Sequence, residues 1–255
     1  MVYYVAYRAS SEPEYMSSIA QQLSALGCRQ IHATFWELDK EHVNRATYLL
    51  QSSLPVFLRR TRDVKKPCFT RDKACSELGS LVVVALSITE ESKKARINSF
   101  LRKAPCVRLC GGVYAFSQRQ ARSERGRRLV DARSFWEFVG NGIDENAVMV
   151  PRLVIANSQV VERILMETKK RVEKEVNSIV NGYKVTFQKA RVGEIAGQRA
   201  IKVSRRLRRR FVRVKAVSAF YEEWLRIDCS TVLMRPYPAI RKVRYLLEAR
   251  QISAL

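Results

Sequence analysis

Apolar residues follow two different spacings over residues 1–156, and their alternation predicts strands and helices in turn. Short runs rich in β-branched and aromatic residues indicate strands, whereas Met16, Ile19, Leu23 and Leu26 recur at helical spacing. The order strand, helix, strand, helix, strand is predicted twice. The first set has strands at 2–7, 28–38 and 54–58 and helices at 13–26 and 40–50; the second has strands at 81–86, 106–116 and 147–155 and helices at 89–104 and 134–139.

The two predicted sets resemble each other, which indicates an internal duplication. Ile19 of the helix at 13–26 corresponds to Ile97 of the helix at 89–104, and Leu23 corresponds to Leu101. Thr89 is placed to cap the helix at 89–104. Strands joined by crossover helices in this order are typical of the split β-α-β, or ferredoxin-like, fold. Each set is too small to bury a large core alone, so we expect the two to pack together as an internal dimer.

From Ser158 onward the pattern is helical. We expect a first helix that Asn181-Gly182 interrupts or ends, a second over 199–227, and a last one over 239–251. The fold class is therefore α+β, with two tandem ferredoxin-like units followed by a helical C-terminal domain. The expected domains are 1–62 and 80–156 for the two units, 63–79 for a basic linker, and 157–255 for a basic α-helical domain.

The charge points to a polyanionic partner. The 255 residues include 47 Lys+Arg against 24 Asp+Glu, a formal net charge of +23, while 47% apolar residues exclude a disordered basic tail. The longest apolar run, 81–86, is far too short to span a membrane, and residues 1–7 lack the basic flank of a secretory signal. None of the six cysteines forms a CxxC pair, so we expect reduced thiols in a cytoplasmic protein, with no membrane partner, no metal site and no cofactor.

Three segments concentrate the basic residues, and we expect them to contact phosphates. Segment 199–215 has nine basic residues and no acidic one, and five of the nine share the helix face opposite Leu207. The sheet aromatics Tyr3, Tyr7, Phe35 and Tyr114 are expected to be core residues more than base-stacking platforms. The candidate nucleic-acid contacts are Lys202, Arg205, Arg206, Arg208, Arg209, Arg210 and Arg213 in the helix; Arg119, Arg122, Arg125, Arg127 and Arg128 in a loop; and Arg59, Arg60, Arg62, Lys65 and Lys66 at the linker.

The stretch from Val2 to Phe35 resembles the ferredoxin-like CRISPR-associated protein two family, whose plait also occurs in VapD-like toxins and PaaX-type regulators. Residues 183–187, followed by the basic helix, resemble the N-terminal region of ChrB-type chromate-resistance regulators. The first resemblance implies a metal-binding aspartate just after the first strand in nuclease members. Arg8 and Ser87 stand at that place, and neither suits a hard cation, so we expect no catalytic residues and no nuclease activity from this site.

The expected function is non-enzymatic binding of double-stranded DNA in a regulatory, architectural or CRISPR-related scaffold role. RNA binding within a ribonucleoprotein remains open, because the same arginines would serve. A metal-dependent nuclease with another carboxylate set remains open too, as does a chromate- or redox-responsive regulator that uses Cys28 and Cys106. The helical domain could also form a homodimer.

Overall fold

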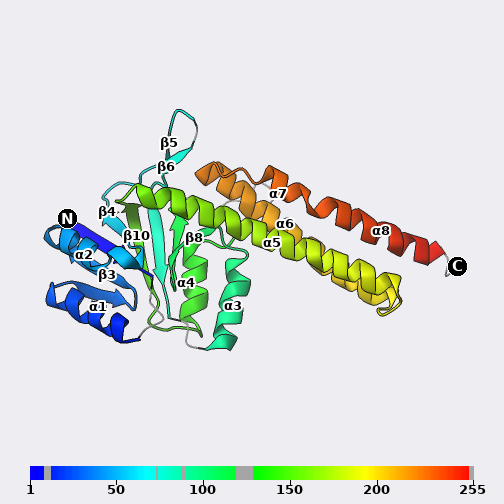
Figure 1. Ribbon diagram of the computed structural model, residues 1–255, viewed down its shortest axis with the longest axis horizontal. Helices are drawn as coiled ribbons and strands as arrows, with labels where there is room; N and C mark the ends of the chain where they lie inside the picture. The colour runs from blue at the N-terminus through cyan, green and yellow to red at the C-terminus, as the bar shows by residue number, and fades with distance from the viewer. Residues whose placement is uncertain (9–12, 73, 88–89, 119–128, 253–255) are drawn as a thin grey trace. The chain divides into compact units, whose positions relative to one another are not determined.

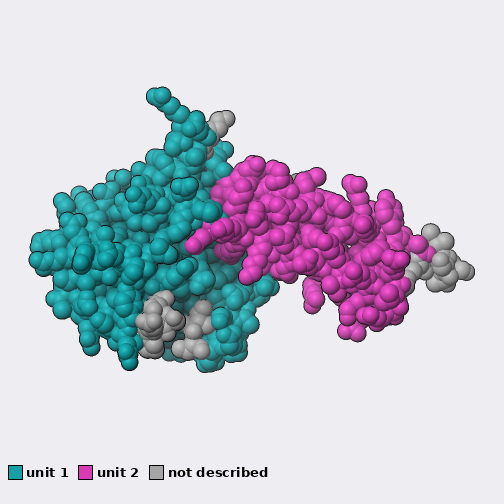
Figure 2. Space-filling model, viewed as in Figure 1, with its two compact units in different colours: residues 1–166, 224–226 teal, residues 167–223, 227–255 magenta. Residues whose placement is uncertain are grey.

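The computed structural model describes residues 1–8, 13–72, 74–87, 90–118 and 129–252 (Figure 1). Thr89, expected to cap a helix, lies outside this part of the chain. The chain forms two compact units: unit 1 contains residues 1–166 and 224–226, and unit 2 contains residues 167–223 and 227–255 (Figure 2). The fold is α+β, with an antiparallel sheet in unit 1 and a helical C-terminal part.

Unit 1 consists of two halves with the same order of elements. The first half contains β1 (Val2–Ala6), α1 (Pro13–Ala25), β2 (Arg29–His32), β3 (Phe35–Asp39), η1 (Lys40–His42), α2 (Val43–Leu49), η2 (Gln51–Ser53) and β4 (Val56–Arg60). The second half contains β7 (Leu81–Ala85), α3 (Glu91–Leu101), β8 (Cys106–Cys110), β9 (Val113–Ser117), α4 (Ala132–Gly140) and β10 (Val148–Ile155). Between them, β5 (Cys68–Phe69) and β6 (Cys75–Glu77) form a separate two-stranded hairpin.

The eight long strands form one antiparallel sheet in the order β2-β3-β1-β4-β10-β7-β9-β8. Within each half, the last strand neighbours the first, the first neighbours the third, and the third neighbours the second. The halves join where β4 pairs with β10, with Leu153 opposite Arg60. A shared sheet thus links the two halves of the duplicated pattern.

The single strands expected at 28–38 and 106–116 are wrong, because each is a hairpin of two strands. The chain turns at residues 33–34 between β2 and β3 and at 111–112 between β8 and β9. Gly112 makes the second turn at φ +76°, where an added Cβ would collide with the carbonyl oxygen of Leu86. The apolar residues on both sides of each turn hide it in the sequence, since a buried hairpin and a long strand share the same composition.

The sheet curls until its two halves face each other. The Thr34 hydroxyl oxygen lies 3.5 Å from Cys110 Sγ and donates a hydrogen bond to the Gly111 carbonyl at 3.3 Å. Thr34 adjoins β3 and Cys110 ends β8, which stand far apart in the strand order. Near the join, a register shift between Val150 and Leu153 includes Arg152 at φ +60°, a bulge that bends β10.

Alternate strand residues build three apolar layers in unit 1. Val5 and Trp36 belong to the cluster that includes Ile19 and Leu23 of α1. Val84 of β7 belongs to the corresponding cluster with α3 and α4 residues. The third layer consists of fully buried strand residues in neither cluster, which lie between the facing halves: Ala6, Phe35, Leu58, Val83 and Ala115.

Unit 2 is helical. It contains most of α5 (Gln159–Arg191) and α6 (Gly197–Leu225), together with α7 (Ser230–Met234) and α8 (Pro236–Ile252). The expected interruption at Asn181-Gly182 is wrong, because α5 continues through both residues. Gly182 instead permits a close approach to α6: a Cβ there would lie 2.8 Å from Leu207 Cδ2. No helix in the described part of the chain has the length and apolar character needed to span a membrane.

Candidate functional site

A strongly basic surface with a regular geometry lies on α6. Its members share one side of the helix, and all five are exposed. The opposite side holds the buried residues Leu207, Phe211 and Val214. We call this surface the arginine edge; its members are Lys202, Arg205, Arg206, Arg209 and Arg213.

Contacts with α5 fix the position of α6 within unit 2. The Arg210 guanidinium donates through Nη2 and Nε to Glu175 Oε2, at 2.6 and 3.0 Å. The Tyr183 hydroxyl donates to the carbonyl oxygen of Ser204 at 3.3 Å. Together with the close approach at Gly182, these contacts hold the backbone beneath the arginine edge in place.

Two of the residues predicted in this segment lie outside the arginine edge. Arg210 is half-buried, and its guanidinium is bound to Glu175. Arg208 is exposed but lies on a different side of the helix.

The arginine edge has an unbalanced positive charge. None of its five members forms an ion pair with a carboxylate in the described ranges of the chain. Unit 2 as a whole contains 21 basic and 8 acidic residues. At 1.5 Å per residue, the edge from Lys202 to Arg213 is about 16 Å long. A polyanion with regularly spaced charges is the ligand that matches such a row.

The predicted linker residues lie in unit 1, and the structure places Arg152 beside residues 60–62 of this group. Arg60, Arg62, Lys65 and Lys66 are exposed, and Arg59 is half-buried. Arg152 Nη1 donates to the carbonyl oxygen of Arg62 at 3.3 Å, and the Arg152 carbonyl accepts from the Thr61 N–H at 2.9 Å.

Sequence reasoning missed Arg152. Positive φ at a residue other than glycine is uncommon and marks a strained position. The signals in the sequence are a proline and an arginine, Pro151 and Arg152, inside an otherwise apolar strand, Val148–Ile155.

The third predicted group, Arg119, Arg122, Arg125, Arg127 and Arg128, lies outside the described residues.

The structure also brings together His32, Ser87 and Asp144, which the sequence places far apart. His32 Nε2 lies 3.3 Å from Asp144 Oδ2 and 3.3 Å from the Ser87 hydroxyl oxygen. The Ser87 backbone N–H donates to the same Asp144 oxygen at 2.6 Å. Burial acts to raise the pKa of Asp144, but the Ser87 and Asn146 N–H groups and the His32 ring outweigh it, so this pKa is lowered.

The geometry of this cluster differs from that of a catalytic triad. In a triad the carboxylate holds one ring nitrogen of the histidine and the hydroxyl meets the other. Here Nε2 alone meets both groups, and the His32 and Asp144 side chains are only 8% and 10% exposed. Since His32 belongs to the first half of unit 1 and the other two residues to the second, the cluster joins the two halves.

The cysteines show no disulfide, and five of the six are buried; Cys68 is exposed. Burial raises the pKa of the Cys28 thiol, and burial raises that of Cys110 to about 11. Thiols of this kind stay protonated and react slowly. Within the described residues, no group of three or more His, Cys, Asp or Glu side chains is placed to hold a metal ion.

Comparisons with models of protein families, with curated proteins and with solved structures found no match to this chain.

Proposed function

We propose that this protein binds nucleic acid without catalysing a reaction on it, that double-stranded DNA is its preferred ligand, and that the arginine edge supplies the main contact. The observation that carries the proposal is the row of five exposed cations on one side of α6 without a carboxylate partner among the described residues. Arginine suits phosphate especially well, because its guanidinium can donate two parallel hydrogen bonds.

The size of the arginine edge supports a duplex ligand. A duplex advances about 3.4 Å per base pair, so an edge of about 16 Å covers roughly five base pairs. The edge lies on a helix whose opposite side is packed, so its backbone loses little conformational entropy on binding.

Three of the four sheet aromatics are buried, and Tyr3 is half-buried, which argues against a base-stacking platform on the sheet. Proteins that bind single strands stack bases on exposed aromatic rings. Tyr7 and Phe35 are 0% exposed and Tyr114 is 6% exposed, so these three rings offer no platform, and the exposed rings of Tyr48, Phe69, Trp136 and Tyr245 lie on four different elements.

We also infer that unit 1 consists of two fused ferredoxin-like units that serve as a scaffold. The strand order within each half supports this inference, because it is β4-β1-β3-β2 in the first half and β10-β7-β9-β8 in the second. A scaffold role agrees with the arrangement of His32, Ser87 and Asp144, which ties the halves together instead of presenting a nucleophile and its base.

The salt dependence of binding tests the proposal. If the five members of the arginine edge each neutralise one phosphate, log Kd for a 20-base-pair duplex rises with log salt concentration at a slope of about 4 to 5. The variant R205Q/R206Q/R209Q should lower this slope by about 3 and weaken binding to every duplex sequence equally.

A matched control removes the same charge elsewhere. Lys40, Arg45 and Lys94 are exposed residues of unit 1, and K40Q/R45Q/K94Q should leave the slope unchanged. Equal effects of the two triple variants would show that net charge alone drives binding and would contradict the role of the arginine edge. Tighter binding to a structured RNA than to duplex DNA would replace DNA by RNA as the ligand.

A further inference from the structure

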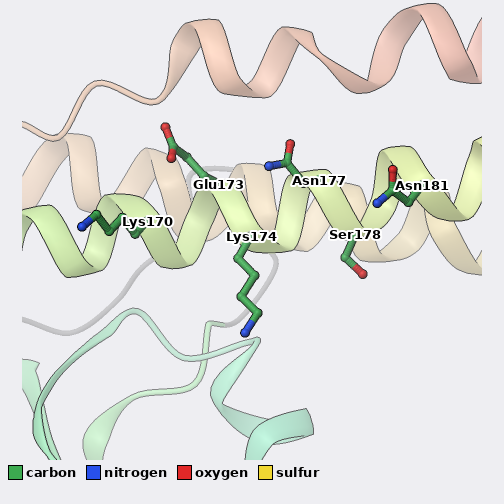
Figure 3. A pocket seen from close by; sticks show the side chains of 6 residues that line it. All are labelled: Lys170, Glu173, Lys174, Asn177, Ser178 and Asn181. Atoms are coloured by element: carbon green, nitrogen blue, oxygen red, sulfur yellow. The ribbon is translucent and has the colours of Figure 1, made fainter.

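The exposed side of α5 carries a second polar surface that the arginine edge does not include. Six side chains surround a wide, open hollow of about 520 Å³ in unit 2 (Figure 3). We call it the α5 hollow; its lining residues are Lys170, Glu173, Lys174, Asn177, Ser178 and Asn181. Figure 3 shows that all six project from one stretch of α5, with Asn177 and Asn181 on the same side of the ribbon.

Three of these residues, Asn177, Ser178 and Asn181, have low helix propensity although they lie within a helix. Asparagine and serine form helices poorly, because their side chains compete for backbone hydrogen bonds. The other exposed positions along α5, apart from Val185, carry strong helix formers: Gln, Glu, Met, Lys and Arg. Asn177, Ser178 and Asn181 lie in the middle of this 33-residue helix. Positions at which local preference disagrees with the fold are commonly functional.

Packing offers no reason for the three residues. All three are exposed, and their side chains make no hydrogen bond with any residue that the structure describes. Gly182, the fourth weak helix former of this stretch, has its reason in the close approach to Leu207. The amide and hydroxyl groups of the α5 hollow therefore remain available to a ligand.

We propose that the α5 hollow reads base edges of duplex DNA, and this inference rests on the nucleic-acid binding proposed above. The major groove is about 12 Å wide and admits a helix, and asparagine can bond an adenine edge with its amide oxygen and nitrogen together. Lysine suits guanine, and a carboxylate such as Glu173 accepts from cytosine. The cores of protein interfaces favour aromatic residues and disfavour lysine, so this composition fits a protein partner less well.

A selection experiment tests the assignment. The wild-type protein is incubated with a library of duplexes that contain 20 random base pairs, and bound DNA is recovered and sequenced. We expect the wild type to enrich a motif and N177A/N181A to bind it less selectively, with discrimination over unselected duplexes reduced by about 5- to 100-fold. The slope of log Kd against log salt should stay unchanged in N177A/N181A, since no phosphate contact is removed.

The melting temperature distinguishes recognition from a structural role of the asparagines, because a structural role would make N177A/N181A melt at a lower temperature. Because alanine forms helices better than asparagine, N177A/N181A should raise the Tm by about 3 °C while it loses selectivity. A lower Tm would assign the asparagines to the fold and overturn the inference. K184Q, at an exposed position of α5 outside the hollow, is the control and should keep the motif.

The two proposals can fail separately. If N177A/N181A enriches the same motif as the wild type, or if the wild type enriches none, the α5 hollow does not read bases, whatever the arginine edge does. If R205Q/R206Q/R209Q binds duplex as tightly as the wild type, the arginine edge is not the main contact. If the wild type binds no duplex, the proposed function itself is wrong. A motif enriched only from an RNA library of the same length would overturn the assignment to duplex DNA.

Discussion

The close approach of α5 and α6 at Gly182 allows a sharp test of how the arginine edge is held. Replacing a glycine by alanine inside a helix ordinarily stabilises it by about 1 kcal/mol. At Gly182 the new Cβ would lie 2.8 Å from Leu207 Cδ2 and 3.2 Å from Cδ1, and Leu207 is only 6% exposed. Crowding of this kind in a packed interior costs about 1–3 kcal/mol. We therefore expect G182A to destabilise the protein by about 1 kcal/mol.

The physical reason can be isolated by shortening Leu207. Valine lacks both Cδ atoms that meet the new methyl group, so G182A should stabilise the L207V variant by about 1 kcal/mol. The coupling between the two sites is then about 2 kcal/mol, well within the range measured for residues in contact. Guanidinium unfolding of the wild type, the two single variants and the double variant gives this number from the midpoints.

The control for this cycle is G140A. Gly140 also lies in a helix, but no atom comes within 4 Å of a Cβ built there, so its replacement should cause no loss of stability. If G182A stabilises the wild type as much as it stabilises L207V, the helices do not meet at this point as described.

Two further perturbations address unit 1. D144N should cost about 2 kcal/mol at pH 7, because it removes the charged acceptor of the Ser87 N–H. Since the folded-state pKa of Asp144 is lowered, this contribution is present above the ordinary value of 3.8 and is lost as the pH falls below it; unfolding curves of wild type and D144N should converge below about pH 4. G112A should cost more than 2 kcal/mol, because φ +76° and the collision with Leu86 act together. G193A, at φ +83° with nothing within 4 Å, should cost only about 1 kcal/mol, so equal losses at the two glycines would show that the collision is unimportant.

Periodicity predicted the elements whose burial is one-sided. Leu207 was expected on the apolar side of a helix, and it is buried there together with Phe211 and Val214, because an amphipathic helix repeats its pattern over many turns. The hairpin turns at 33–34 and 111–112 escaped prediction, since apolar residues flank them on both sides. Asn181-Gly182 resembles a helix end in sequence, yet the pair lies within α5 because a glycine serves helix packing there.

The candidate sites also divide into one that the sequence predicted and others that only the structure shows. The arginine edge follows from spacing along one helix, so the sequence contains all of its geometry. The cluster of His32, Ser87 and Asp144 depends on the curled sheet, which brings residues of both halves to within 3.3 Å. Arg152 and the α5 hollow were also missed, because the sequence marks the place of a bulge but not what its residues contact, and an absence of side-chain partners appears only in three dimensions.

The residues that follow the first strand of each half of unit 1 bear on the choice between a binding protein and a nuclease. In the second half, Ser87 follows β7, Asp144 precedes β10, and His32 completes the cluster from the end of β2. The equivalent place in the first half holds Arg8, whose N–H donates to the Ser53 carbonyl at 2.9 Å, and the end of β8 contributes the Cys110 thiol, whose pKa is raised to about 11. The site in the second half therefore has one carboxylate, Asp144, which already accepts the Ser87 backbone N–H. The site in the first half has the cation of Arg8 and the protonated thiol of Cys110. Hard divalent cations select clustered oxygen ligands, so neither site suits one. This divergence supports the proposed scaffold role of unit 1, and it agrees with the proposal that the arginine edge and the α5 hollow of unit 2 make the contacts with nucleic acid.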